Sequence, residues 1–431
     1  MLYENLSVNN QGVLTFAGQD TKTLAETYGT PLLLLDGDMV RSRCREYMQA
    51  MADFLPPGSR PFYASKALSY LGIYRMMAEE GMGVDVVSSG ELYTALVAGF
   101  PAEDICFHGC SKTDADIRFA MEHGVGVFIC DSFQELETLE EEAARQGIRQ
   151  KILLRLQPGI DPHTHEKIST GNIDCKFGVA IETGQAAEFV ALALEKEHLE
   201  LLGYHCHIGS QIFDHVPFCD AAVMMLRFCK EMQDKLNYFP KVLNLGGGMA
   251  VPYTAAESKV NYRENIRNIG SLLMRTCWDL EIPAPVIYME PGRSIVGDAG
   301  MTLYRVVSTK TIPGFRNYVT IDGGMSDNPR YTLYESPYTV LPADRMGDAA
   351  EYTCTVGGCC CESGDLIQEN VALPQPKRGD LLAVLTTGAY NYSMASNYNR
   401  VPRPPIVVVE QGQCKIAVRR ETLADLLHCD Y

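Results

Sequence analysis

A regular alternation of short apolar runs and helix-period segments constrains this 431-residue chain more than any other feature of its sequence. Strands that alternate with helices pair in parallel and are joined by right-handed crossovers. Eight such units within about 230 residues predict a closed (β/α)8 barrel, with an open doubly wound sheet as the alternative. The expected strands lie at residues 61–65, 84–88, 105–108, 125–130, 151–156, 201–208, 242–246 and 286–290.

Capping signals indicate where the helices between these strands begin and end. Ser88 and Glu91, and likewise Ser132 and Glu135, have the spacing of a capping box, in which the hydroxyl and the carboxylate each accept a hydrogen bond from a free backbone amide. Glycines stand where helices should end, at Gly81, Gly99, Gly124 and Gly147. Both signals favour the alternation of strand and helix.

After Glu290 the pattern changes to β-rich runs that are separated by Gly and Pro and have little helical period. Such runs predict an antiparallel β domain, of sandwich or barrel-like form. The first 36 residues are also strand-like and are expected to join it. We therefore predict a barrel domain over 37–290 and a β domain built from 1–36 and 291–431.

The charge and cysteine content exclude several classes of protein. With 37 basic and 54 acidic residues the formal charge is −17, so nothing steers the chain to nucleic acid or anionic lipid. No apolar run approaches the ~18 residues that span a membrane, and the first residues lack the regions of a signal peptide. Fifteen dispersed cysteines, an odd number, favour reduced thiols over a disulfide framework. We expect a cytoplasmic protein.

Polar residues and glycines gather at the ends of the expected strands, where (β/α)8 barrels carry their chemistry. Each type has a plain structural alternative: a lysine after a strand is usually at the surface, a glycine run is often a turn, and a lone histidine suits a packed core. The residues at these ends are Lys66, Asp85, His108, His207, Ser210, Gly246, Gly247, Gly248, Glu290 and Arg293.

Together these residues match the needs of one ligand. A lysine amine reacts with an aldehyde, and the backbone amides of a glycine run bind phosphate. A carboxylate beside a ring nitrogen keeps that nitrogen protonated. Lys66, the glycines at 246–248 and Glu290 supply these groups, and His207 can stack on a flat ring. The set points to pyridoxal 5′-phosphate (PLP).

From about residue 25 to residue 410 the chain resembles the alanine-racemase-fold (fold type III) PLP-dependent decarboxylases, and within them the diaminopimelate decarboxylases. It departs from their usual pattern at residues 109–112 (GCSK), at Cys175 and in the cysteine run 359–361. The motifs that carry the resemblance are YASKA (63–67), SSGEL (88–92), HTHEKISTG with KFG (163–178), HCHIGSQ (205–211), NLGGGMAVPY (244–253), MEPGR (289–293), IDGGMSDNPRYTLY (321–334), CESGD (361–365) and GAYNYSM (388–394).

The resemblance implies cofactor-binding roles for residues of the barrel. Lys66 is then the catalytic lysine that holds the PLP aldehyde, His207 stacks on the ring, and Glu290 pairs with the ring nitrogen. The remaining implied cofactor-binding residues are Asp85, Ser210, Gly246, Gly247, Gly248, Gly292, Arg293 and Tyr390.

The resemblance also implies a substrate site and a homodimer with shared active sites. Cys361 is the preferred proton donor to Cα, with Lys66 as the alternative, and Cys361 and Glu362 match a pair that similar enzymes insert from the partner subunit. The implied substrate-binding residues are Arg293, Arg330, Tyr334, Glu362 and Tyr390.

Two arginines and an acid suit a substrate whose distal end carries a carboxylate and an ammonium group. They favour decarboxylation of meso-2,6-diaminopimelate to L-lysine and CO2, the last step of lysine biosynthesis. The alternatives are a decarboxylase of ornithine, arginine or carboxynorspermidine and a non-catalytic binding homologue. No metal is expected, because the His and Cys pairs lack zinc spacing. The stretch 160–177 is the expected lid.

Overall fold

The computed structural model describes residues 3–160 and 175–431. The chain divides into two compact units, which we call the barrel unit and the β unit. Because residues 161–174 are not among those described, most of the expected lid at 160–177 lies outside the described residues. The barrel unit comprises Arg43–Ala250 and Val260–Ser294, and the β unit comprises Met1–Ser42, Val251–Lys259 and Ile295–Tyr431.

The barrel unit is built on a closed ring of parallel strands, which confirms the closed barrel and excludes the open sheet. Each strand pairs with its neighbour along the chain, and β13 pairs with β5 to close the ring. A short strand, β10 (Val179–Ala180), adds to β9. The ring consists of β5 (Arg60–Ala64), β6 (Gly83–Val86), β7 (Ile105–Phe107), β8 (Val127–Cys130), β9 (Gln150–Gln157), β11 (Leu199–His205), β12 (Val242–Asn244) and β13 (Val286–Met289).

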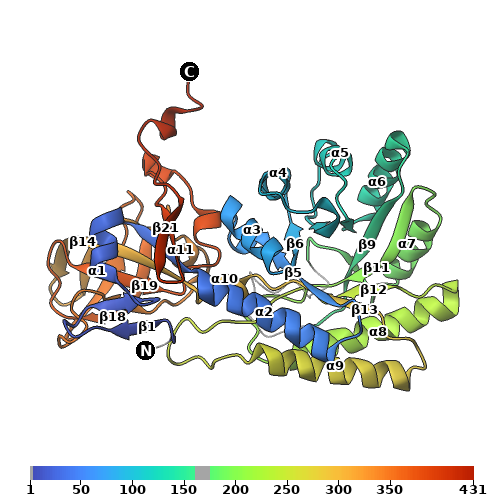
Figure 1. Ribbon diagram of the computed structural model, residues 1–431, viewed down its shortest axis with the longest axis horizontal. Helices are drawn as coiled ribbons and strands as arrows, with labels where there is room; N and C mark the ends of the chain where they lie inside the picture. The colour runs from blue at the N-terminus through green and yellow to red at the C-terminus, as the bar shows by residue number, and fades with distance from the viewer. Residues whose placement is uncertain (1–2, 161–174) are drawn as a thin grey trace. The chain divides into compact units, whose positions relative to one another are not determined.

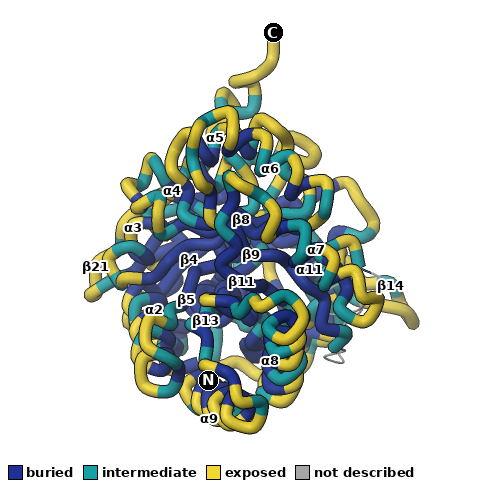
Figure 2. Tube along the Cα trace, turned by 90° about the vertical axis from the view of Figure 1, so that its right-hand side faces the viewer, coloured by how far each residue is buried: buried dark blue, intermediate teal, exposed yellow. Residues whose placement is uncertain are grey.

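Helices follow the strands and surround the ring, with buried residues on their inner faces and exposed residues outside (Figures 1 and 2). The long helix α2 (Gly37–Phe54) precedes β5. The helices between the later strands are α3 (Leu71–Glu79), α4 (Ser89–Val97), α5 (Asp114–Glu122), α6 (Phe133–Gln146), α7 (Gln185–Leu194), α8 (Val216–Leu236) and α9 (Tyr262–Asp279).

The expected helix starts carry hydroxyl caps, but the carboxylate half of each box differs from the prediction. Ser88 Oγ accepts the Glu91 amide at 3.2 Å, whereas Glu91 Oε2 accepts the amide of Val87, one residue before the cap, at 2.8 Å. The box at Ser132 has the same arrangement. A complete capping box forms instead at Thr113. Each free amide still has an acceptor, so the helices begin where expected.

Apolar side chains from several strands meet in one buried cluster of the barrel. Phe62 from β5, Ile129 from β8 and Leu153 from β9 belong to it, together with Leu202 and Val242 from the next two strands of the ring. A barrel of this size is filled by its side chains and is not a pore. A ligand must therefore bind at an end of the barrel, where the loops lie.

The β unit is centred on one long strand, β14 (Gly300–Ile312), which pairs antiparallel with β4, β15 and β19. The sheet is largely antiparallel, but β15 with β17 and β20 with β4 are parallel pairs, which the sequence pattern did not indicate. The strands around β14 are β4 (Leu32–Asp36), β15 (Arg316–Ile321), β16 (Val340–Pro342), β17 (Tyr352–Gly357), β18 (Leu366–Leu373), β19 (Leu381–Leu385), β20 (Ile406–Glu410) and β21 (Gln413–Val418).

The N-terminal strands form a small sheet of their own and pack in the β unit. Leu14 and Phe16 lie in one buried cluster with Leu303 of β14 and Val407 of β20. The elements are β1 (Leu6–Val8), β2 (Leu14–Phe16), β3 (Gln19–Asp20) and α1 (Thr21–Tyr28).

The β unit also contains the short segment 251–259, which the expected domain boundaries place in the barrel.

Across the described residues, no helix is both long and apolar enough to cross a bilayer.

Candidate active site

The carboxyl ends of the barrel strands bring together side chains that are distant in sequence. Lys66 lies in a 3-10 turn, Ser65–Ala67, directly after β5. Asp85 lies on β6, His108 follows β7 and Glu290 follows β13. Since all these strands are parallel, their carboxyl ends share one end of the barrel.

Glu290 is a buried carboxylate surrounded by donors from three other strands. Its Oε1 lies 2.8 Å from His108 Nε2 and accepts a hydrogen bond of 2.7 Å from Asn244 Nδ2. Its Oε2 lies 3.3 Å from His205 Nε2. Burial acts to raise the pKa of Glu290, but His108 and His205 outweigh it and hold that pKa well below its usual range. The site therefore keeps one buried negative charge in place.

Asp85 is a second buried carboxyl group, with a different environment. It is 0% exposed, and neither of its oxygens has a hydrogen-bond partner in the described part of the chain. His108 Nε2 lies 3.6 Å from Asp85 Oδ1. Burial raises the pKa of Asp85 to about 6, although His108 and Lys66 act against it. An unsatisfied buried carboxyl group is costly and marks a place for a ligand donor.

The glycine run after β12 is held so tightly that side chains are excluded. A Cβ on Gly247 would lie 1.9 Å from the Glu290 carbonyl oxygen. The Gly247 amide donates to His207 Nδ1 at 3.2 Å, and Gly246 accepts the Glu290 amide at 2.8 Å. Burial, Lys66 and Arg155 hold the pKa of His207 well below its usual value. A neutral imidazole therefore lies against the glycine backbone.

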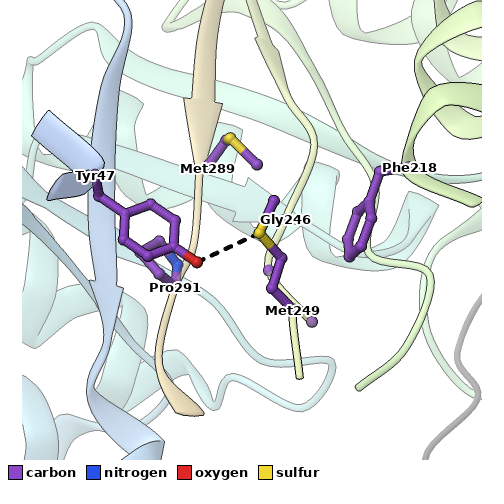
Figure 3. A pocket seen from close by; sticks show the side chains of 8 residues that line it. Tyr47, Phe218, Gly246, Met249, Met289 and Pro291 are labelled. Carbon is purple, nitrogen blue, oxygen red and sulfur yellow. Dashed lines mark hydrogen bonds between the residues drawn. The ribbon is translucent and has the colours of Figure 1, made fainter. Parts of the chain in front are cut away.

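An apolar pocket lies on one side of the glycine run, and Figure 3 shows the side chains that line it. The pocket is too small for a cofactor. Its volume of about 10 Å³ holds at most a single water molecule. The Tyr47 hydroxyl bonds to Met249 Sδ at 3.4 Å and to Ser294 Oγ at 2.8 Å. Its apolar lining is Tyr47, Phe218, Met249, Met289 and Pro291. We infer that this apolar side of the glycine run packs against the barrel and that it does not bind a ligand.

Arg293 supplies a buried positive charge at the same end of the barrel. Its Nη2 donates to Ser210 Oγ at 3.0 Å. A Cβ on the preceding residue, Gly292, would come within about 3.0–3.1 Å of the Cβ atoms of Ala64 and Ala67, so this turn packs closely on the turn that carries Lys66. Arginine and a serine hydroxyl together suit an anionic group such as phosphate or carboxylate.

The other predicted site residues belong to the β unit. Arg330 begins the short helix α11 (Arg330–Tyr334) and is buried, with the rings of Tyr334 and Tyr390 at 5.2 and 5.8 Å from its Cζ. Cys361 and Glu362 are exposed on the turn before β18.

That turn contacts α11, because Thr332 Oγ1 donates to the Gly364 carbonyl at 2.8 Å. The structure therefore brings the predicted residues together in two groups, one in each unit.

Three residues that surround Glu290 are not among the site residues that the resemblance implies: His108, His205 and Asn244. His108 was visible at a strand end, and Asn244 directly precedes the glycine run. The ligand-type atoms of His108, His205 and Glu290 lie within 4.8 Å of one another, a donor set that also occurs around metals. In this structure Glu290 hydrogen-bonds directly to His205 and to Asn244.

The barrel residues fit the PLP that the resemblance implies. Glu290 offers a carboxylate to a protonated ring nitrogen, and Asp85 has two unpartnered oxygens. Backbone atoms occupy the Cβ positions of the glycine run, and the amides of Gly246 and Gly247 donate to Asn244 Oδ1 and His207 Nδ1. The side-chain donors that fit a phosphate at this end of the barrel are Ser210 and Arg293. Lys66 is close enough for its charge to act on both Asp85 and His207.

We predict that Asp85→Asn stabilises the cofactor-free protein above about pH 6, by up to about 3 kcal/mol. Folded Asp85 has a pKa of about 6, whereas an aspartate in the unfolded chain ionises near pH ~3.9. Above both values wild type must therefore bury a charge that the amide lacks. The gain should shrink as the pH falls from about 6 toward about 4, measured by urea unfolding.

The matched control is the exposed Asp53, which bonds to Arg263 and has a lowered pKa. Asp53→Asn should give no gain at any pH. A gain from Asp85→Asn that persists unchanged at low pH would contradict the assignment of the effect to ionisation of Asp85.

Comparison with known proteins agrees with this geometry. Residues 38–297 match the family described as pyridoxal-dependent decarboxylase, pyridoxal binding domain. The diaminopimelate decarboxylase of Bacillus subtilis (strain 168) is 45% identical over 424 residues, which cover 98% of this chain and 96% of the relative.

Solved structures show the same likeness. The crystal structure of diaminopimelate decarboxylase from M. jannaschii in complex with L-lysine superposes with a TM-score of 0.91 at 32% identity, covering 99% of this chain and 98% of the other. The lysine/ornithine decarboxylase of Vibrio vulnificus, complexed with putrescine, gives a TM-score of 0.75 at 25% identity, covering 90% and 96%. This chain therefore belongs to the diaminopimelate decarboxylase family of pyridoxal-dependent decarboxylases.

Proposed function

We propose that the protein removes CO2 from meso-2,6-diaminopimelate to give L-lysine, with PLP as its cofactor. The observation that carries the substrate assignment is Arg330, which is buried and pairs with no carboxylate in the described residues. A substrate with a distal carboxylate supplies the missing anion, whereas a substrate that ends in an amine alone does not. The name and the 45% identity of the Bacillus subtilis relative support the same assignment.

The barrel residues act on the cofactor. Lys66 would hold the aldehyde carbon of PLP and His207 would stack on its ring, while Glu290 would keep a proton on the ring nitrogen, because a fixed carboxylate favours the charged form. Bound PLP supplies an electron sink for the electron pair that remains on Cα when CO2 departs. Arg293 and Ser210, hydrogen-bonded to each other, bind the phosphate together with the glycine backbone.

Residues of the β unit act on the substrate. Arg330 binds the distal carboxylate, while Tyr334 and Tyr390 contribute hydroxyl groups. Glu362 is exposed and attracts the distal ammonium group. Cys361, also exposed, delivers a proton from Sγ to Cα after CO2 leaves, and Lys66 is the alternative donor.

The alternative function is decarboxylation of a substrate without a distal carboxylate, such as ornithine. The likeness to the Vibrio vulnificus lysine/ornithine enzyme favours it, at lower identity and TM-score. We expect CO2 release from meso-diaminopimelate and little from L-ornithine. Arg330→Ala should raise KM for diaminopimelate by about 10- to 100-fold, since a hydrogen bond to a charged group contributes about 1.5–3 kcal/mol.

The control for this prediction is Arg316→Ala, since Arg316 lies in the same unit but pairs with Glu369 at 2.6 Å. It should leave KM unchanged. A preference for ornithine in wild type would replace the proposed substrate, and an unchanged KM in Arg330→Ala would remove Arg330 from the substrate site.

We predict that Lys66→Ala loses both CO2 release and the visible absorbance of bound PLP, because alanine has no amine to bond to the PLP aldehyde. The measurement is an absorbance scan beside a CO2 assay. Lys151→Ala, an exposed position on β9, is the matched control and should keep both. Retention of activity and absorbance by Lys66→Ala would refute the assignment.

We further propose a homodimer in which Cys361 and Glu362 complete the partner's site, as the resemblance implies. Lys66→Ala and Cys361→Ala, each inactive alone, should recover about a quarter of wild-type activity when co-expressed, because half of the dimers are hybrids with one intact site.

The control pair, Lys66→Ala with Glu290→Gln, should recover nothing, since both changes damage the barrel end of a single chain. Sedimentation should show a dimer. Equal recovery in both pairs, or none in the first, would exclude sites shared in this way.

A cytoplasmic location is part of the proposal. The fifteen cysteines carry thiols, and many of them are buried in the barrel. A reducing compartment suits a chain whose proposed proton donor, Cys361, is an exposed thiol.

A further inference from the structure

The β unit buries the positive charge of Arg330 among aromatic rings. The rings of Tyr253, Tyr334 and Tyr390 lie 5.8, 5.2 and 5.8 Å from its Cζ. Its Nη2 donates to Ser336 Oγ at 3.1 Å, and its Nε has no hydrogen-bond partner within residues 3–160 and 175–431. The guanidinium therefore retains donors for a ligand.

Rings and carboxylates compensate a buried cation in different ways. The face of an aromatic ring attracts a cation by about 0.5–2 kcal/mol, and it leaves the N–H groups of the cation free to donate hydrogen bonds. A carboxylate would occupy the N–H groups. The cation is thus stabilised while its donors stay available.

The rings of Tyr253, Tyr334 and Tyr390 form what we call the cage around Arg330, and Tyr253 is held by contacts of both its backbone and its ring. Its amide donates to Glu257 Oε2 at 2.6 Å, and its carbonyl accepts from Thr339 Oγ1 at 2.8 Å. The edge of its ring meets the ring of Tyr338, with centroids 5.5 Å apart and planes at 74°. These contacts fix the ring on the short segment 251–259, which joins the β unit.

Tyr338 contacts Tyr253 and also the residue next to Tyr390. Its hydroxyl donates to Asn391 Oδ1 at 3.1 Å, and both groups are buried. Tyr390, the preceding residue, has φ of 61°, in the left-handed region that costs a non-glycine residue about 1–2 kcal/mol. The bond to Asn391 helps to hold Tyr390 in this conformation, so two of the three cage rings depend on Tyr338.

We propose that Tyr253 is a positioning residue for substrate recognition: its ring holds the Arg330 guanidinium in place and leaves N–H groups for the distal carboxylate, while Tyr338 supports the cage. The proposal rests on the proposed function, because it takes diaminopimelate as the source of that carboxylate. It explains why this arginine is surrounded by tyrosines rather than acids.

The test compares Tyr253→Leu with Tyr253→Phe. Loss of the ring should raise KM for meso-diaminopimelate about tenfold and change kcat by less than about threefold, since a cation–π contact is removed but the reacting groups are not. Tyr253→Phe keeps the ring and should restore KM. The matched control is Tyr331→Leu on α11, whose hydroxyl bonds to Glu369 at 2.7 Å instead, and its KM should stay unchanged.

A binding measurement separates recognition from turnover. In the PLP-loaded protein, calorimetry with the product L-lysine, which keeps the distal carboxylate and is not turned over, should show that Tyr253→Leu weakens binding about tenfold. If Tyr253→Leu does not fold, Tyr338→Phe carries the test, with an expected rise in KM of about threefold. Wild type that is inactive on diaminopimelate overturns the proposed function. Active wild type with unchanged KM in the folded variants, or an equal effect in Tyr331→Leu, overturns the positioning role.

Discussion

The charge on Glu290 is the feature on which the rest of the barrel end depends. It is buried, and a buried carboxylate is tolerated only where donors surround it. His205 lies on β11, Asn244 lies on β12 and His108 directly follows β7, so the charge is satisfied only when those strands stand in the observed order. Glu290 also packs against the glycine run, because its carbonyl oxygen leaves no room for a Cβ on Gly247.

The two units solve the problem of a buried charge in different ways. In the barrel unit, Glu290 is fixed by hydrogen-bond donors and so is available to pair with a cationic ring nitrogen. In the β unit, Arg330 is stabilised by ring faces and keeps its own donors. Glu290 is thus held by two histidines and an asparagine, and Arg330 by aromatic rings and a serine. Such surroundings suit binding sites, whereas a purely structural charge is usually paired directly.

The fold and the cofactor chemistry were largely readable from the sequence. The eight strands of the ring lie close to the predicted runs, since buried parallel strands are apolar and the helices between them carry capping signals. The distinctive motifs also named Lys66 and Glu290. His205 and Asn244 lie within the motifs HCHIGSQ and NLGGGMAVPY, but neither was assigned a role. Their role is to face Glu290 across the ring, and no spacing along the chain expresses that relation.

The sequence by itself determined the alternation of strand and helix, the family and the identity of the chemistry-bearing residues, because these depend on local periodicity and on short motifs. Tertiary structure alone decided which polar groups meet: the donors around Glu290, the unpartnered oxygens of Asp85 and the rings around Arg330. The physical reason is that charge burial and hydrogen bonding act through space, between strands and segments whose pairing is set by the whole fold.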